Sequence, residues 1–243
     1  MGIYRIAGFI VRLNNQYPYT EWLCRHYAVE SEYADFIVSA SPEEIAADQA
    51  LSGFSADLCE STALYRNLCG QLISHNTFLL HAAVVELHGS GYAFLGESGA
   101  GKSTHMALWV KHLGARIVNG DKPLIRMVKQ EDDSIPQFIA YGTPWAGKEG
   151  LQRNTSTPLS AIVFIEQAER NEIVRLDPAD CVKRIFHQML LPKNAADASC
   201  LLALTDQFVR DIPAYRLSCG ISREAAKLCC STILGDISPN TPK

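Results

Sequence analysis

The chain has 243 residues, of which 47% are hydrophobic, and its formal net charge is −4. This length predicts one large domain, or a domain with a small appendage, that buries a substantial core. The acidic balance argues against a generally basic surface for nucleic acid and against a polybasic patch for membranes. We therefore expect the chain to bind neither nucleic acid nor a membrane.

The sequence patterns that indicate membrane insertion and cellular compartment agree with this expectation. The longest apolar runs, near 79–87 and 161–165, are too short to cross a bilayer, and the first ten residues do not have the pattern of a signal peptide. None of the eight cysteines forms a Cys-x-x-Cys pair, so neither a zinc site nor a redox motif is indicated. Reduced and mostly buried thiols are typical of cytosolic proteins, and we expect a cytoplasmic protein.

Residues 1–75 have the pattern of a small mixed α/β segment that packs on the rest of the chain. Loose alternation predicts one strand over 3–13 and another over 35–39. Ser41-Pro42-Glu43-Glu44 has the hydroxyl cap, proline and acidic residues that begin a helix, and a longer helix is expected over 57–72.

Residues 76–235 form the predicted main domain. Two apolar runs, 78–87 and 92–95, are joined by the turn His88-Gly89-Ser90-Gly91, which predicts a β-hairpin. The second arm leads directly into a glycine-rich loop and then an amphipathic helix that ends at Gly114.

The later elements follow in chain order. We expect strands over 115–118, 123–128, 137–141, 158–165, 172–176 and 214–218, helices from 177, over 195–211 and over 222–234, a polar turn at 130–134, a long loop over 142–157, and a frayed tail over 236–243. A loop as long as the one after 141 is often functional in a compact domain.

The glycine-rich loop Gly96-(four residues)-Gly101-Lys102-Ser103 matches the phosphate-loop pattern in full. Its glycines let backbone N–H groups turn inward around an anion, and the following helix adds partial positive charge. Lys102 places a charge on the outer phosphates, and Ser103 offers a hydroxyl to Mg²⁺. We predict that ATP or GTP binds with Mg²⁺ at Gly96, Glu97, Ser98, Gly99, Ala100, Gly101, Lys102, Ser103 and Thr104.

Asp121 follows an apolar strand and is the candidate second acid of the site. Its carboxylate suits a metal ligand or the base that accepts a substrate hydroxyl proton. The alternative is a turn residue beside Gly120. Glu166 is a competing candidate of the same form, but a charged and exposed turn follows it.

Three further features have a functional and a purely structural interpretation. His81 lies inside an apolar strand and is either a site residue or a hydrogen-bonded core residue. The loop 142–154 either closes over phosphates and substrate, with glycine hinges, or is a solvated surface loop. Its candidate substrate residues are Trp145, Lys148, Glu149 and Arg153. His105 and His112 have no third ligand, so no metal site is expected there.

Over about residues 78–235, and most closely over 81–123, the chain resembles the catalytic domain of bacterial HPr kinase/phosphorylase, and specifically a shorter HPr-kinase-like branch. In that family a histidine-bearing strand, a tight turn, a short strand and a phosphate loop follow in this order, as His81, 88–91, 92–95 and 96–103 do here. The resemblance implies a mixed α/β sheet of the HPr kinase/phosphoenolpyruvate carboxykinase-like P-loop fold, with a hairpin that feeds the loop.

The same resemblance implies roles for single residues. Asp121 would be the catalytic and metal carboxylate, with His81 as its neighbour and Lys102 on the phosphates. The chain departs from the family pattern at two places: Gly120 stands where the family has the first of two aspartates, and the later metal-associated glutamate is not recognisable.

Three functions remain open from the sequence. The first is a kinase that transfers the terminal phosphoryl group of ATP to a serine of a peptide or small protein, and short relatives near peptide-modification genes suggest a precursor peptide. The second is a small-molecule kinase. The third is a non-catalytic nucleotide-binding regulatory or assembly protein, in keeping with Gly120. Assembly into a homo-oligomer stays open.

Overall fold

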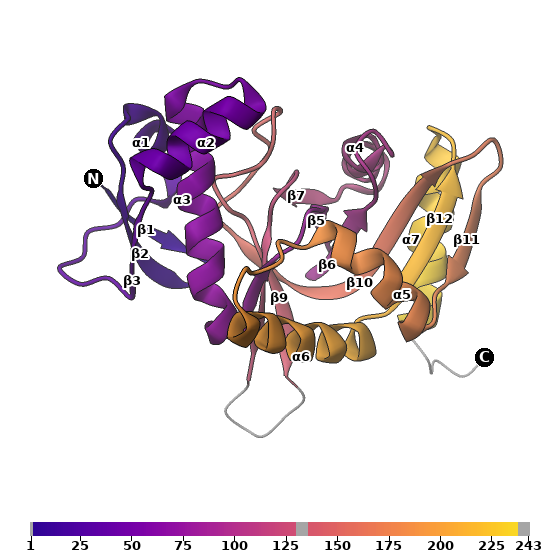
Figure 1. Cartoon of the computed structure of the whole chain (residues 1–243). Helices are drawn as coiled ribbons and strands as arrows, with labels where there is room; N and C mark the ends of the chain where they lie inside the picture. Colours follow the sequence, from indigo (N-terminus) through magenta and orange to yellow (C-terminus); the bar gives the residue numbers. More distant parts are fainter. Residues whose placement is uncertain (1, 130–135, 238–243) are drawn as a thin grey trace.

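Two β-sheets and the helices around them make up residues 2–129 and 136–237, the part of the chain that this computed structural model describes (Figure 1). The result is a mixed α/β fold with a curled mixed sheet. The polar turn expected at 130–134 lies outside the described residues, as does most of the tail expected over 236–243.

The strands are β1 (Gly2–Ile6), β2 (Phe9–Asn14), β3 (Phe36–Ser39), β4 (Thr77–Leu79), β5 (Ala83–Leu87), β6 (Ser90–Leu95), β7 (Arg116–Asn119), β8 (Leu124–Val128), β9 (Gln137–Tyr141), β10 (Ser156–Gln167), β11 (Glu172–Arg175) and β12 (Ala214–Cys219). The helices are α1 (Pro18–Cys24), α2 (Pro42–Ser52), α3 (Ala56–Leu72), α4 (Lys102–Leu113), α5 (Pro178–Ile185), α6 (Ala195–Asp211) and α7 (Arg223–Ile237). The 3-10 turns are η1 (Arg25–Tyr27), η2 (Ile73–His75) and η3 (Phe186–Gln188).

The N-terminal elements form a small sheet, in the order β1-β2-β3, with helices against it. The single strand predicted over 3–13 is wrong, because Ala7 and Gly8 both have positive φ, at 51° and 85°, and turn the chain into a hairpin. The alternating pattern continues across this two-residue turn, so the sequence does not reveal it. Helix α1 was also not predicted.

The predicted start of α2 is confirmed by its hydrogen bonds. The Ser41 side chain accepts a hydrogen bond from the Glu44 N–H, while the Glu44 carboxylate accepts one from the Ser41 N–H. This capping box satisfies two N–H groups that a helix start would leave without partners. Gly53, in the left-handed conformation, ends the helix.

In the large sheet, β10 connects two halves. Its first residues pair with β9, which continues through β8 to β4, and its later residues pair with β6 and β12. Strands β6, β10 and β12 are parallel, and β5 is antiparallel to both β6 and β7. The strands β7, β6, β10 and β12 therefore end at one edge of the sheet, and β5 begins there. In mixed and parallel sheets this edge is where ligands bind.

The predicted hairpin over 78–95 is correct only in its second half. The first arm is broken at residues 80–82: β4 pairs with β8, whereas β5 pairs with β6. At the break, the N–H groups of Leu80, His81 and Ala82 donate to the carbonyls of Pro123, Gln188 and Asp121. A continuous apolar run thus crosses between two halves of the sheet, and His81 lies at the crossing.

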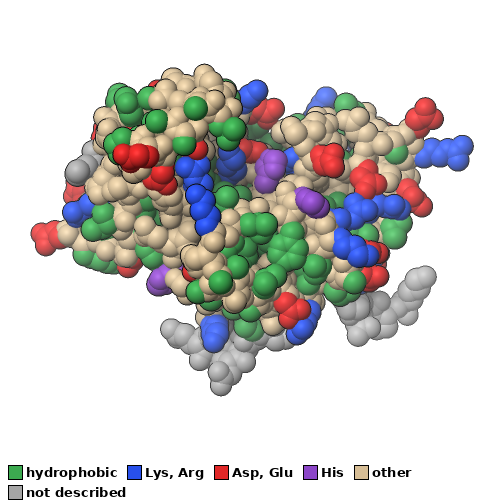
Figure 2. Space-filling model, viewed as in Figure 1, with side chains coloured by type: hydrophobic (Ala, Val, Ile, Leu, Met, Phe, Trp, Pro, Cys, Tyr) green, Lys and Arg blue, Asp and Glu red, His purple; other side chains and the backbone are tan. Residues whose placement is uncertain are grey.

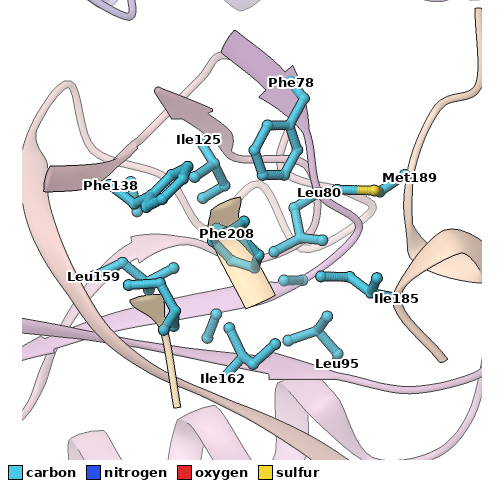
Figure 3. Close-up of a cluster of buried hydrophobic side chains, with 14 of the residues drawn as sticks. Phe78, Leu80, Leu95, Ile125, Phe138, Leu159, Ile162, Ile185, Met189 and Phe208 are labelled. Carbon is cyan, nitrogen blue, oxygen red and sulfur yellow. The ribbon is translucent and has the colours of Figure 1, made fainter. Parts of the chain in front are cut away.

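The large sheet buries side chains on both faces, because neighbouring residues of a strand point to opposite sides. Val85, Phe94 and Val163 face a cluster with α4 and α7. Val84 and Ile162 face the other cluster, which includes residues of α5 and α6 (Figures 1 and 3). Figure 3 shows Phe208 of α6 among Phe78, Phe138 and Leu80, where it makes edge contacts with the first two rings.

Elements late in the chain lie close to their predicted ranges. Helix α6 has the predicted bounds, and β10 is longer than the predicted strand by two residues at each end. The N-terminal cluster, built on β1–β3, α1 and α3, also includes Leu124 and Trp145 from the main sheet and its loop. The two parts of the chain therefore share buried surface.

Candidate functional site

The glycine-rich loop lies between β6 and α4, at the edge where β6 ends. Gly96 has a φ of 148°, and a Cβ there would lie 2.9 Å from the carbonyl oxygen of Ile165 in β10. Only glycine fits this approach without displacing backbone. The Gln167 amide donates to the Gly99 carbonyl at 2.8 Å and holds the middle of the loop against the end of β10.

Lys102 is the first residue of α4, and its side chain turns back across the loop. Its Nζ donates to the carbonyls of Gly96 at 2.8 Å and Glu97 at 3.1 Å. Burial lowers the pKa of Lys102, and the negative charge of Asp121 opposes this shift. The ammonium and the Asp121 carboxylate therefore belong to one electrostatic site.

Asp121 and His81 form a hydrogen-bonded pair at this same edge. The His81 Nε2 lies 3.0 Å from Asp121 Oδ1, and the Lys122 Nζ lies 3.7 Å from Oδ2. Burial raises the pKa of Asp121, but the hydrogen bond from His81 and the charges of Lys122, His81 and Lys102 together lower it below its usual value. The carboxylate is ionised at neutral pH, as a metal ligand or a proton acceptor must be.

Asn119, which the sequence analysis did not identify, holds the turn that carries Asp121. Its Oδ1 accepts hydrogen bonds from the N–H groups of Asp121 at 2.9 Å and Lys122 at 2.8 Å. Its Nδ2 donates to the carbonyl of Thr143 at 3.1 Å. The Asn-Gly-Asp sequence was a signal for such a turn, because asparagine side chains often bond to backbone two residues on.

The loop 142–154 packs directly on this turn. A Cβ at Gly147, whose φ is 73°, would lie 3.0 Å from the Asp121 Cβ. A Cβ at Gly120 would lie 3.3 Å from the carbonyl oxygens of Ala146 and Leu151. Little room therefore remains at position 120 for the carboxylate that the HPr kinase pattern has there.

The candidate substrate residues of this loop divide into two groups. Lys148, Glu149 and Arg153 are exposed. Trp145 is only 7% exposed, stacks on Tyr65 with ring centroids 4.1 Å apart, and donates through Nε1 to the Ser61 carbonyl at 3.1 Å. The expectation that Trp145 faces a substrate is corrected, because its ring is occupied by the contact with α3.

Gln188 of η3 connects the phosphate loop with His81, and the sequence had no signal for it. Its carbonyl accepts a hydrogen bond from the His81 N–H at 2.7 Å. Its side-chain nitrogen, in the orientation that satisfies both groups, donates to the carbonyls of Gly96 at 3.1 Å and His81 at 3.3 Å. One buried side chain thus sets the first glycine of the loop relative to the His81–Asp121 pair.

Two cavities lie on either side of the loop. The first, of about 560 Å³, is lined by residues 96–100, the end of β10, and Arg184, His187 and Gln188. The second, of about 460 Å³, is lined by residues 99–101, by α4 and by the ends of β10 and β12. Figure 2 shows a hollow between the N-terminal elements and the elements around α4, with histidine and basic side chains on its walls.

Glu166, the competing acidic candidate, belongs to the first cavity. Its Oε1 pairs with Arg184 Nη1 at 2.7 Å, and both side chains are partly exposed. Glu166 is therefore paired with a cation of α5, whereas Asp121 is paired with His81.

The residues present suit a magnesium–nucleotide complex. The described residues contain no group of three or more His, Cys, Asp and Glu side chains that would hold a metal by itself. Mg²⁺ at a nucleotide takes one or two protein oxygens and completes its shell with phosphate oxygens and water. The Ser103 hydroxyl and the Asp121 carboxylate offer oxygen atoms of that kind.

Comparison with protein families gives a match over two thirds of the chain. The model described as "ScmC: SynChlorMet cassette protein ScmC" matches residues 62–225, which is 164 of the 243 residues. The chain belongs to this family. The match includes the glycine-rich loop, His81, Asp121, the loop 142–154 and Gln188. It leaves out β1–β3, α1 and α2.

No curated protein matches this chain. Among solved structures, the HPr(Ser) kinase/phosphatase from Coxiella burnetii matches with 14% identity and a TM-score of 0.34, over 65% of this chain and 88% of that chain. In the part of the chain that the structure describes, no helix is both long and apolar enough to cross a membrane.

Proposed function

We propose that this ScmC-family protein is a kinase that transfers the terminal phosphoryl group of ATP or GTP to a hydroxyl of a peptide or small protein. The observation that carries the proposal is geometric: Asp121, paired with His81 at 3.0 Å, follows β7 at the edge of the sheet where β6 leads through the glycine-rich loop to Lys102. A phosphate-binding cation beside a proton acceptor is the arrangement that phosphoryl transfer requires.

In the proposed reaction, the loop N–H groups and Lys102 hold the triphosphate by its charge. The acceptor oxygen forms a bond to the terminal phosphorus while the bond from that phosphorus to the bridging oxygen breaks, and the nucleoside diphosphate leaves. Asp121 accepts the hydroxyl proton, and His81 orients the carboxylate by its hydrogen bond to Oδ1. Mg²⁺, held by Ser103 and Asp121, would neutralise charge on the phosphates.

The loop 142–154 supports the proposal through its position. It covers the Gly120–Asp121 turn, with Gly147 against the carboxylate-bearing residue. A covered base is shielded from water, which limits hydrolysis of the nucleotide in place of transfer. Its exposed Lys148 follows Gly147 and is available to an acidic acceptor or to phosphate, whereas Arg153 lines a separate cavity with Glu86 and Arg116. A small-molecule acceptor is the alternative within the same reaction class.

A second function, nucleotide binding without transfer, is favoured by one observation. Gly120 leaves a single carboxylate at the turn, and the crowding by Ala146 and Leu151 leaves little room for another. If one carboxylate does not suffice for transfer, the protein binds nucleotide as a regulatory or assembly partner.

Calorimetry and a transfer assay separate these outcomes. We expect the wild-type protein to bind ATP or GTP only with Mg²⁺, Lys102→Ala to weaken that binding at least about tenfold, and Asp121→Asn to keep it. With γ-labelled nucleotide and a library of serine-containing peptides, wild type should transfer label and Asp121→Asn should not. Binding with no transfer by wild type favours the second function, and absence of magnesium-dependent binding rejects both.

A further inference from the structure

Lys102, the cation of the glycine-rich loop, has little capacity left for a ligand. An ammonium group has three N–H donors, and two of those of Lys102 already reach the carbonyls of Gly96 and Glu97. The charge of a phosphoryl group in transfer spreads over its three outer oxygens. A second cation with free donors near Asp121 would therefore serve the proposed reaction.

Lys122, directly after Asp121, is such a cation. Its Nζ lies 3.7 Å from Asp121 Oδ2, which is too long for a hydrogen bond, and it makes no hydrogen bond with any other residue that the structure describes. Its side chain is 43% exposed. The donors of this ammonium are therefore free and within reach of a ligand.

The main chain at Lys122 is held firmly although the end of its side chain is free. Its N–H donates to Asn119 Oδ1 at 2.8 Å, and its carbonyl accepts hydrogen bonds from the hydroxyls of Tyr65 and Thr143, both at 2.7 Å. Tyr65 and Thr143 are buried, and they belong to α3 and to the loop 142–154. Three separate elements thus fix the position from which the ammonium extends.

The two oxygens of Asp121 have different neighbours. Oδ1 lies 3.0 Å from His81 Nε2, so Oδ2, on the side of Lys122, is the oxygen left to accept a hydroxyl proton. A base must lie within about 3 Å of the atom that gives up the proton. An acceptor oxygen beside Oδ2 is therefore also near Lys122, and so is the phosphorus atom to which that oxygen becomes bonded.

We propose that the Lys122 ammonium binds the terminal phosphate of the nucleotide and donates hydrogen bonds to its oxygens as the phosphoryl group passes to the acceptor. The inference rests on the kinase reaction proposed above and adds a catalytic residue to it. The bonds that form and break stay the same, the hydroxyl proton still goes to Asp121, and Lys122 keeps its own protons throughout. Because Gly120 leaves only one carboxylate at this turn to hold a metal ion, a lysine supplies positive charge to the phosphate directly.

Calorimetry with magnesium–ATP and magnesium–ADP tests this contact, because ADP lacks the terminal phosphate. We expect Lys122→Ala to lose about tenfold in affinity for ATP and less than about twofold for ADP, whereas Lys122→Arg keeps the charge and most of the ATP affinity. Lys227→Ala, at an exposed lysine of α7, removes the same charge and should change neither affinity. The hydrogen bonds at position 122 come from its main chain, so the variants should fold, and circular dichroism checks this.

The transfer assay gives a second measurement. Lys122→Ala should lower turnover about a hundredfold, and Lys122→Arg should restore part of it. Equal losses of ATP and ADP affinity in Lys122→Ala, or an unchanged ATP affinity, would overturn the phosphate contact and leave the kinase proposal standing. A wild-type protein that binds neither nucleotide would instead reject the proposed function, and this inference with it.

Discussion

At the scale of single residues, the site depends on a few positions where a side chain is either required or excluded. Asp121 is ionised because His81, Lys122 and Lys102 together outweigh the effect of burial on its pKa. At position 96 the backbone of β10 leaves no room for a side chain. Each of these conditions leads to a measurement.

Gly96→Ala should weaken magnesium–ATP binding at least about tenfold, because the added Cβ would lie 2.9 Å from the Ile165 carbonyl and 3.0 Å from the Ala100 Cβ. The loop must then move away from β10. Gly89→Ala is the control: it also places alanine at positive φ, 82°, but nothing lies within 4 Å of its Cβ. It should lower the melting temperature and keep ATP affinity, and equal ATP affinity in both variants would contradict the argument.

His105 should make stability depend on pH. Its folded pKa of about 4 is below the unfolded value near 6.5, so the unfolded chain binds more protons between these values. Stability is therefore fully present above about pH 6.5 and is lost as the pH falls towards 4, by roughly 2 kcal/mol between pH 7 and pH 5. Urea unfolding at both pH values measures this loss. In His105→Gln, which keeps an acceptor for Trp109, the loss of stability between pH 7 and pH 5 should be smaller by about this amount. If the variant loses as much stability as wild type, other groups cause the pH dependence.

At the scale of elements, the site is assembled from segments that lie far apart in the sequence and contact one another in the fold. Helix α3 anchors the loop 142–154 through Tyr65 and Ser61, the loop covers the turn after β7, and η3 joins the break before β5 to the phosphate loop. Changes in these connecting contacts should alter transfer more than nucleotide binding.

Trp145→Ala should cost about 3–5 kcal/mol in the free energy of unfolding, since it removes a buried aromatic ring that stacks on Tyr65. It should also reduce the rate of phosphoryl transfer more than ATP affinity, because the loop over Asp121 loses its anchor. Trp145→Phe keeps a ring and should lie between the variant and wild type. Urea unfolding and the transfer assay measure the two effects, and a full-rate Trp145→Ala protein would show that the loop position does not matter.

Substitutions at Gln188 test whether its side chain positions Gly96 relative to His81. Gln188→Met has a similar shape but cannot donate to the carbonyls of Gly96 and His81, and Gln188→Glu places a carboxylate against the same two oxygens. Each lost hydrogen bond is worth about 0.5–1.5 kcal/mol. Transfer turnover should fall in the order Gln, Met, Glu, with a smaller change in the KM for ATP. A change confined to the melting temperature would mean that Gln188 only supports the fold.

At the scale of the whole molecule, the N-terminal elements and the main sheet share one buried cluster. Leu124 of β8 and Trp145 pack with side chains of β1, β2 and α3, so separation of the two parts would expose apolar surface on both. The family match begins inside α3, at residue 62, and so includes most of this helix, whose buried side chains belong to the shared cluster.

Shared burial predicts that the two parts unfold together. Trp109 lies in the core beside α7, Trp145 lies at the junction, and Trp22 lies on α1. Thermal unfolding followed by tryptophan fluorescence should therefore coincide with unfolding followed by far-ultraviolet circular dichroism. Two separate transitions would show that the N-terminal elements form an independent unit.

Several features of the fold were predictable because their signals lie close together in the chain. The glycine-rich loop was predicted between a strand and a helix, and residues 96–101 connect β6 to α4 in the structure. The capping box of α2 spans Ser41 to Glu44, and α6 has its predicted bounds. In each case the residues that determine the element also form it, so no distant contact is needed.

The sequence by itself determined the position of the glycine-rich loop, the main helices and the strand that leads to Asp121, because local backbone preference and hydrophobic period are properties of short segments. Only the tertiary structure decided that the chain breaks at 80–82, that Trp145 is an anchor, and that Gln188 and Asn119 hold the site. These outcomes depend on pairings between residues that are tens of positions apart. Such pairings are set by which strands and helices pack together, and no pattern within a single segment records them.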